Sequence, residues 1–135
     1  MKDLITYVVH YTPLKKRKQL LLAELNKHNL NHYFIEDYDR EKLTDEDLRL
    51  FDNKLRLSIC SNMLKHFYAY REIANNDYKY NLIVEDDVLF HPNFKDILPG
   101  KLKQLPDDYD MLFISDGAGL HVPNPIPSKV IYKKS

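Results

Sequence analysis

The chain has 135 residues and a mass of 16.1 kDa, a length that suits one domain and is short for two. Its 44% hydrophobic and 30% charged residues are typical of a soluble globular protein and exclude the disordered and fibrous classes. Twenty Lys and Arg residues balance twenty Asp and Glu residues, so we expect no nucleic acid partner that depends on a strong overall positive field.

Several other classes are excluded by what the sequence lacks. It has no run of ~18 apolar residues that could form a membrane span, and its first residues do not resemble a secretory signal. The single Cys60 can form neither an internal disulfide nor a cysteine zinc site. With only three glycines, the chain contains no dinucleotide-binding or P-loop glycine motif. We therefore expect a cytoplasmic protein.

The first half of the chain predicts two strands separated by a helix. Residues 4–9 form a β-branched and aromatic run typical of a buried strand. Thr12 is a candidate N-cap, and Pro13 a candidate first residue, for a helix that we expect to reach about Asn29. A second strand is expected at about residues 32–35.

Two helices and a strand are expected next. Thr44 and Asp47 have the spacing of a capping box and predict a short helix that reaches about Phe51. A long helix is expected over residues 57–75, and a third strand over residues 80–84. Five apolar residues at helical spacing predict the buried stripe of the long helix: Ile59, Met63, Phe67, Tyr70 and Ala74.

The last third predicts shorter elements. A helix should begin after residues 91–93 and be broken by Pro99 and Gly100, with a further brief turn beyond them. Residues 111–114 are expected to form a fourth strand, and residues 130–132 a last β-like piece. The alternation of strands and helices predicts a single domain, 1–135, of the α/β class with a mostly parallel sheet.

Polar and mostly acidic residues follow each expected strand. Because parallel strands place their carboxyl ends on one edge of the sheet, where ligands bind in such folds, we expect these residues to gather there. An acidic edge on a chain without net charge favours a divalent cation as its partner.

The triplet Glu85-Asp86-Asp87, directly after the third strand, is the most informative segment. On an extended chain Glu85 and Asp87 would project to one side and Asp86 to the other. Such a pair of carboxylates can bind Mg²⁺ or Mn²⁺, and the metal could bridge to a diphosphate. A solvated acidic turn is the alternative explanation.

Residues 80–90, YNLIVEDDVLF, resemble the central signature of the family 25 glycosyltransferases, which include lipopolysaccharide-type and collagen galactosyl- and glucosyltransferases. The first strand with its Arg-containing helix, the long helix about twenty residues before the triplet, and LPDDYDMLFIS at residues 105–115 agree in order and spacing. The resemblance covers nearly the whole chain, although Ser61-Asn62 stands where the family commonly has Ser-His. It implies a GT-A-like (Rossmann-like) fold and metal-dependent, usually Mn²⁺-dependent, inverting transfer of a hexose from a UDP-sugar to a glycan or hydroxylysine-type acceptor.

The resemblance also implies roles for residues at the strand ends. Asp87 is the expected metal ligand, and Glu85 or Asp86 would contact the metal, its water or the ribose. The loop His10–Thr12 would lie near the nucleoside, where Tyr11 could stack on the uracil base. The alternative for Tyr11 is an ordinary half-buried aromatic side chain, and the alternative for the acidic residues is a solvated turn.

Further residues are candidates as well. Arg17 could approach a phosphate, although a solvated helical arginine is the default. Asp37 and Asp39 could bond the ribose or uracil, or only form a turn. Asp116 is the candidate catalytic base that would accept the proton of the acceptor hydroxyl.

The chain resembles only the donor-binding half of the family's catalytic domain, so two other functions stay open. One is a binding or interaction module that keeps nucleotide-sugar affinity without turnover. The other is an unrelated metal-dependent phosphoesterase that uses residues 85–87. A homo-oligomer is also possible if self-association covers an exposed sheet edge.

Overall fold

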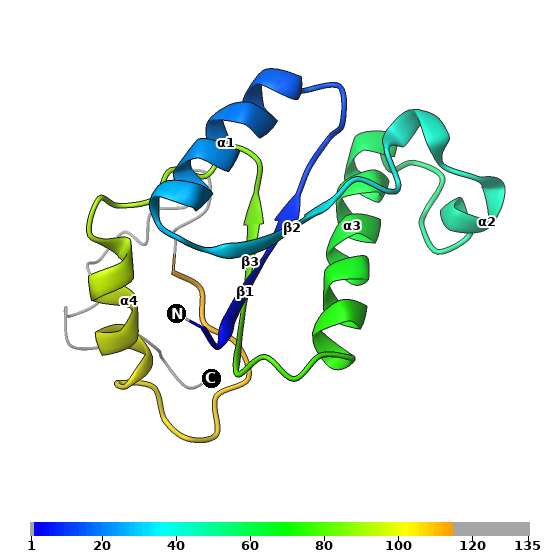
Figure 1. Cartoon of the computed structure of the whole chain (residues 1–135). Helices are drawn as coiled ribbons and strands as arrows, with labels where there is room; N and C mark the ends of the chain where they lie inside the picture. Colours follow the sequence, from blue (N-terminus) through cyan, green and yellow to red (C-terminus); the bar gives the residue numbers. More distant parts are fainter. Residues whose placement is uncertain (1, 115–135) are drawn as a thin grey trace, which may run out of the picture. The chain divides into compact units, whose positions relative to one another are not determined.

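The structure is a computed structural model in which residues 2–114 are described. The chain divides after His91 into two compact units, of which the larger holds a parallel sheet and the smaller a short helix, α4. Figure 1 follows the chain through both. The expectation that residues 1–135 form one domain stays a prediction.

The sheet of the larger unit has three parallel strands in the order β2-β1-β3. They span β1 (Leu4–Val9), β2 (Asn31–Ile35) and β3 (Tyr80–Glu85), close to the predicted strands. Val8, in the centre, pairs with Phe34 on one side and with Val84 on the other. The predicted α/β class with a parallel, Rossmann-like sheet flanked by helices is confirmed.

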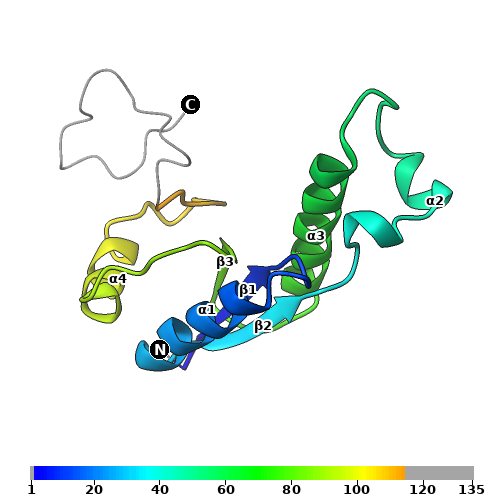
Figure 2. The same cartoon turned by 90° about the horizontal axis from the view of Figure 1, so that it is seen from above.

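Two helices flank this sheet, α1 (Lys15–Lys27) and α3 (Leu57–Ala74). The chain crosses from β1 to β2 in one direction and from β2 past β1 to β3 in the other. Right-handed crossovers in opposite directions place their helices on opposite faces, and Figures 1 and 2 show α1 and α3 on either side of the strands. The core on the α3 side is built around Tyr7, Val9, Ile35 and Ala69.

The predicted apolar stripe of α3 is wrong. Four of its members keep 39–44% of their surface exposed: Ile59, Met63, Phe67 and Tyr70. The buried face instead carries Cys60, Ser61, Leu64, Lys65 and Ala69. The helix is rotated relative to expectation because the polar ends of Ser61 and Lys65 find partners in the loop after β2, which offsets the cost of burying them.

Of the two predicted helix caps, the one at the start of α2 is confirmed and the one at the start of α1 is wrong. Thr44 and Asp47 form the predicted capping box at the start of α2 (Asp45–Leu48), which follows the 3₁₀ helix η1 (Arg40–Lys42). Thr12 does not cap α1, whose N-cap is Leu14. The helix begins two residues later than expected, and the Thr12 hydroxyl donates to the buried carboxylate of Asp39.

In the smaller unit, helix α4 (Phe94–Leu102) continues through Pro99, so the predicted break is wrong. The Pro99 carbonyl still accepts from the amide of Lys103, so helical hydrogen bonding continues beyond the proline. Residues 111–114 form no strand, because they pair with no neighbour within the described part of the chain. The expected β-like piece at residues 130–132 lies outside the described residues.

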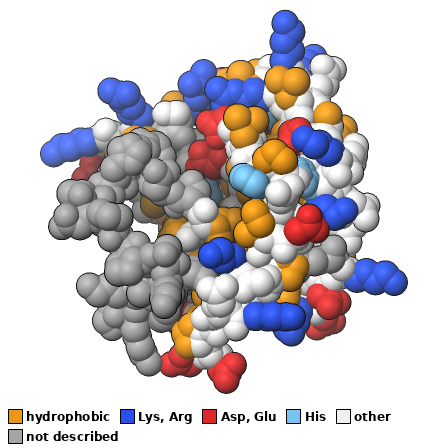
Figure 3. All heavy atoms as spheres, turned by 90° about the vertical axis from the view of Figure 1, so that its left-hand side faces the viewer, with side chains coloured by type: hydrophobic (Ala, Val, Ile, Leu, Met, Phe, Trp, Pro, Cys, Tyr) orange, Lys and Arg blue, Asp and Glu red, His pale blue; other side chains and the backbone are white. Residues whose placement is uncertain are grey.

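The surface mixes charges of both signs. Figure 3 shows Lys and Arg side chains interspersed with Asp and Glu side chains on the face turned to the viewer, in line with the balanced composition. Between residues 2 and 114, none of the helices combines the length and apolar character needed to cross a membrane.

Candidate functional site

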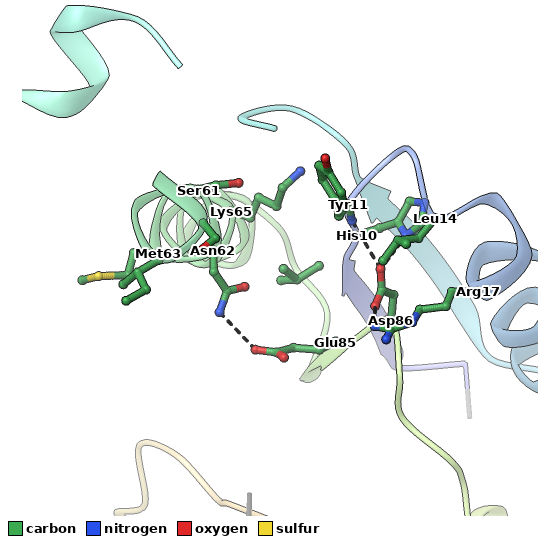
Figure 4. Close-up of a pocket in the computed structure, with 13 residues that line it drawn as sticks. His10, Tyr11, Leu14, Arg17, Ser61, Asn62, Met63, Lys65, Glu85 and Asp86 are labelled. Carbon is green, nitrogen blue, oxygen red and sulfur yellow. Dashed lines mark hydrogen bonds and ion pairs between the residues drawn. The ribbon is translucent and has the colours of Figure 1, made fainter. Parts of the chain in front are cut away.

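A pocket of about 370 Å³ lies where the ends of β1 and β3 meet the first turns of α1 and α3. Figure 4 shows its walls, with His10, Leu14 and Arg17 on one side and the α3 residues facing them. In the strand order β2-β1-β3 the chain leaves β1 toward β2 while β3 lies on the other flank. The carboxyl ends of β1 and β3 therefore form a topological switch point, the place where open α/β sheets bind ligands.

Asp86 is the structural centre of this edge. Its carboxylate, 9% exposed, accepts hydrogen bonds from His10 Nδ1 at 2.8 Å, from the Tyr11 amide at 3.3 Å and from Arg17 at 3.0 Å. The three donors come from the end of β1 and from α1, more than 65 positions away along the chain. Asp86 thus joins β3 to the β1–α1 loop, and it turns Arg17 from a solvated side chain into an ion-pair partner.

His10 is fully buried below this carboxylate. Its ring meets Phe34 edge-on at 5.7 Å between centroids. Among the described residues, Nε2 of His10 has no hydrogen-bond partner. The bond to Asp86 therefore fixes the ring through Nδ1 alone.

The other two acids of the triplet contact different elements. Glu85, 54% exposed, lies 3.2 Å from Asn62 Nδ2 and 3.5 Å from His66 Nε2, both on α3. Asp87, 64% exposed, lies 3.8 Å from Arg17 on the α1 side. The expected alternation fails because the chain turns at Asp86 and is no longer extended.

Tyr11, which lies beside His10 in the pocket wall, is held by the segment after β2 (Figure 4). Its hydroxyl donates to Glu41 at 2.5 Å, and the Arg40 guanidinium lies 4.9 Å from its ring centroid. The bond to Glu41 raises the pKa of the Tyr11 hydroxyl and lowers the pKa of Glu41. One face of the Tyr11 ring is therefore already covered by a cation.

Lys65 is a site residue that the sequence did not reveal. Its ammonium, only 3% exposed, donates to the carbonyl of Asp37 at 2.6 Å and to the carboxylate of Asp39 at 3.0 Å. Burial raises the pKa of Asp39, but bonds from Thr12 and Lys65 outweigh it and hold that pKa below its ordinary value. A lysine within an amphipathic helix normally indicates a solvated position, so only the pairing with Asp39 could have marked it.

The candidate residues divide into three groups. The structure brings five of them together around the pocket: His10, Tyr11, Arg17, Glu85 and Asp86. Thr12, Asp37 and Asp87 lie beside it without lining it, and Asp116 lies outside the described residues. Asn62, Lys65 and Ser61 line the pocket and were not among the sequence candidates. In residues 2–114 there is no cluster of three or more His, Cys, Asp or Glu side chains arranged to hold a metal ion.

Comparison with known proteins identifies the family. The profile described as Glycosyltransferase family 25 (LPS biosynthesis protein) matches residues 4–133, which include all the strands and the whole pocket. The chain belongs to glycosyltransferase family 25. Within this family 25 chain, the side-chain amide of Asn62 donates to Glu85 at the pocket.

A relative named "Putative glycosyltransferase R655", from Acanthamoeba polyphaga mimivirus, is 28% identical over 123 residues. The match covers 84% of the family 25 chain described here and 38% of the relative, so the chain spans well under half of that protein. No solved structure gave a significant match.

Proposed function

We propose that the pocket binds the nucleoside diphosphate part of a UDP-hexose, and that the chain supplies the donor site for inverting glycosyl transfer. The observation that carries the proposal is the position of the pocket, at the β1/β3 switch point of a family 25 chain, between carboxylates and a cationic side chain. Its volume of about 370 Å³ lies within the usual range for small-molecule sites.

Arg17 and Tyr11 are the groups that suit a nucleoside diphosphate. The Arg17 side chain is half exposed and anchored at one edge by Asp86, so its remaining N–H groups can bond a phosphate oxygen. Tyr11 offers its uncovered ring face to the base, while Arg40 covers the other.

The residues present also fit a divalent metal brought in with the donor. Mg²⁺ and Mn²⁺ need oxygen ligands and keep several waters, so one or two carboxylates with phosphate oxygens suffice. Asp86 is committed to three donors, whereas Asp87 and Glu85 are exposed and adjacent to it. We propose Asp87 as the ligand, with Glu85 in support. When bound, the metal would neutralise charge on the departing diphosphate.

The proposed reaction joins an acceptor hydroxyl of a glycan or hydroxylysine-type acceptor to a hexose, galactose or glucose. The hydroxyl oxygen bonds to C1 from the face opposite UDP, the bond from C1 to the phosphate oxygen breaks, and the hydroxyl proton passes to a carboxylate. Asp116 is the proposed base. His10 and Asp86 fix the positions of Arg17 and of the Tyr11 loop, residues 10–12, while the diphosphate leaves.

Calorimetric titration of the purified chain with UDP, with and without Mn²⁺, tests this proposal. We expect Mn²⁺-dependent binding that Asp87→Asn weakens by at least about tenfold, which corresponds to about 1.4 kcal/mol. Asp77→Asn is the matched control, since Asp77 is also an exposed acid but precedes β3 at the far edge of the sheet. Equal UDP affinity in Asp87→Asn and Asp77→Asn would overturn the metal assignment.

Assays of sugar transfer and of phosphoester hydrolysis, run beside these titrations, separate the alternatives. Binding of UDP-hexose without transfer to any acceptor identifies a binding module without turnover. Hydrolysis of a phosphoester substrate with no affinity for UDP identifies a phosphoesterase instead.

A further inference from the structure

We propose that the buried Lys65–Asp39 pair is a positioning device that holds the Tyr11 loop in the geometry required to bind the donor nucleotide. This inference rests on the proposed function. It concerns two residues that neither the sequence motifs nor the family resemblance connects to each other.

The pair is unusual for its place in the fold. Lys65 lies in the middle of α3, and both its ammonium and the Asp39 carboxylate are 3% exposed. Removing two charges from water is costly, and well-packed apolar residues often stabilise a fold as well or better. Stability alone therefore does not explain the pair, and a role in fixing one geometry does.

The contacts of the pair join three segments that are distant in sequence. Asp39, after β2, accepts from both the hydroxyl and the amide of Thr12, in the loop after β1. Lys65 donates from α3 to Asp39 and to the Asp37 carbonyl. Ser61, one turn earlier, donates to the Tyr38 carbonyl at 2.6 Å, where Tyr38 has a positive φ of 64°. Residues 37–39 are thus held at several points while one of them adopts a backbone conformation that favours glycine.

The pocket lies directly beside this junction. Tyr11 precedes Thr12, and its ring is held by Glu41 and Arg40, which immediately follow Asp39. Ser61 and Lys65 themselves line the pocket. One ion pair consequently positions both Tyr11 and the groups that pack against it, and its loss frees both together.

Three variants separate positioning from stability. Lys65→Met leaves Asp39 buried without its cation and should lower both the urea midpoint and the affinity for UDP. The double variant Lys65→Met with Asp39→Leu removes both charges and should regain much of the midpoint. Leu64→Ala is the control, because Leu64 is a buried neighbour of Lys65 on α3 that does not line the pocket.

The readouts are UDP binding with Mn²⁺ by calorimetry, urea unfolding, and hydrogen exchange of residues 10–14 and 36–41. We expect the double variant to bind UDP at least about tenfold more weakly than the wild type and to exchange faster in both segments. Leu64→Ala should lose stability and keep its affinity. Wild-type affinity in the double variant, or an affinity loss in Leu64→Ala equal to that of Lys65→Met, would overturn the proposal.

The exchange measurement separates the two proposals from each other. If the wild-type chain binds no UDP, the proposed function fails. Faster hydrogen exchange in both segments of the double variant would then still support the positioning role of the Lys65–Asp39 pair, and unchanged exchange would refute it.

Discussion

Replacing Asp86 with alanine tests whether this residue is mainly a structural anchor. The variant removes the acceptor of three donors and leaves the fully buried His10 ring without a partner for Nδ1, in addition to Nε2. A hydrogen bond to a charged group contributes about 1.5–3 kcal/mol, and most of that is lost at His10, whose side chain is fully buried. Arg17 is half exposed and becomes hydrated again, so its ion pair adds at most about 1 kcal/mol.

We therefore expect Asp86→Ala to lower the free energy of unfolding by about 2–4 kcal/mol. Arg17→Met should lower it by less than about 1 kcal/mol. Asp87→Ala should change it by no more than about 0.5 kcal/mol, because that carboxylate is exposed and lies 3.8 Å from the Arg17 guanidinium.

Urea unfolding followed by circular dichroism measures all three changes. The comparison requires an unchanged dependence of the free energy on urea concentration, so that the midpoints report stability alone. If Asp86→Ala cost no more than Arg17→Met, His10 would not depend on Asp86, and the central role given to this carboxylate would be refuted.

Further predictions concern pH, a tyrosine pair and a helix cap. The pKa of Asp39 is lowered on folding. The stability that this carboxylate contributes is therefore fully present above its unfolded pKa of about 3.9 and is lost as the pH falls through the lower folded pKa. Acid unfolding curves of the Lys65→Met, Asp39→Leu double variant should lack this component. The hydroxyl of Tyr33 and burial raise the pKa of Tyr68 to about 12, so ultraviolet titration of Tyr33→Phe should show that tyrosine ionising at lower pH, and an unchanged midpoint would contradict the contact. Thr44→Ala should cost about 0.5–1 kcal/mol in urea unfolding and speed exchange at the start of α2, whereas unaltered exchange there would show that the cap contributes little.

Much of the fold follows from local patterns in the sequence. Short runs rich in apolar and aromatic residues, bounded by polar ones, predicted all three strands of the sheet within a residue or two. The Thr44 capping box was equally local, since both of its hydrogen bonds lie within four residues. The acidic triplet could likewise be placed at a strand end, because it directly follows the apolar run that forms β3.

Residues 111–114 and Pro99 show where local patterns fail. An apolar run becomes a strand only beside a partner that supplies hydrogen bonds, and the sequence of residues 111–114 does not contain that information. A proline was expected to end a helix, yet α4 continues through Pro99, whose carbonyl still accepts from the amide of Lys103.

By itself the sequence determined the class of the fold, the strand ends and the acids that follow them. Only the tertiary structure decided which acid is buried, which face of α3 turns inward, and that Lys65 belongs to the pocket wall. The physical reason is distance along the chain. Asp86 contacts His10 across 76 positions of the sequence, and Lys65 contacts Asp39 across 26. The desolvation cost of burying a charge is offset only when such a distant partner is in place.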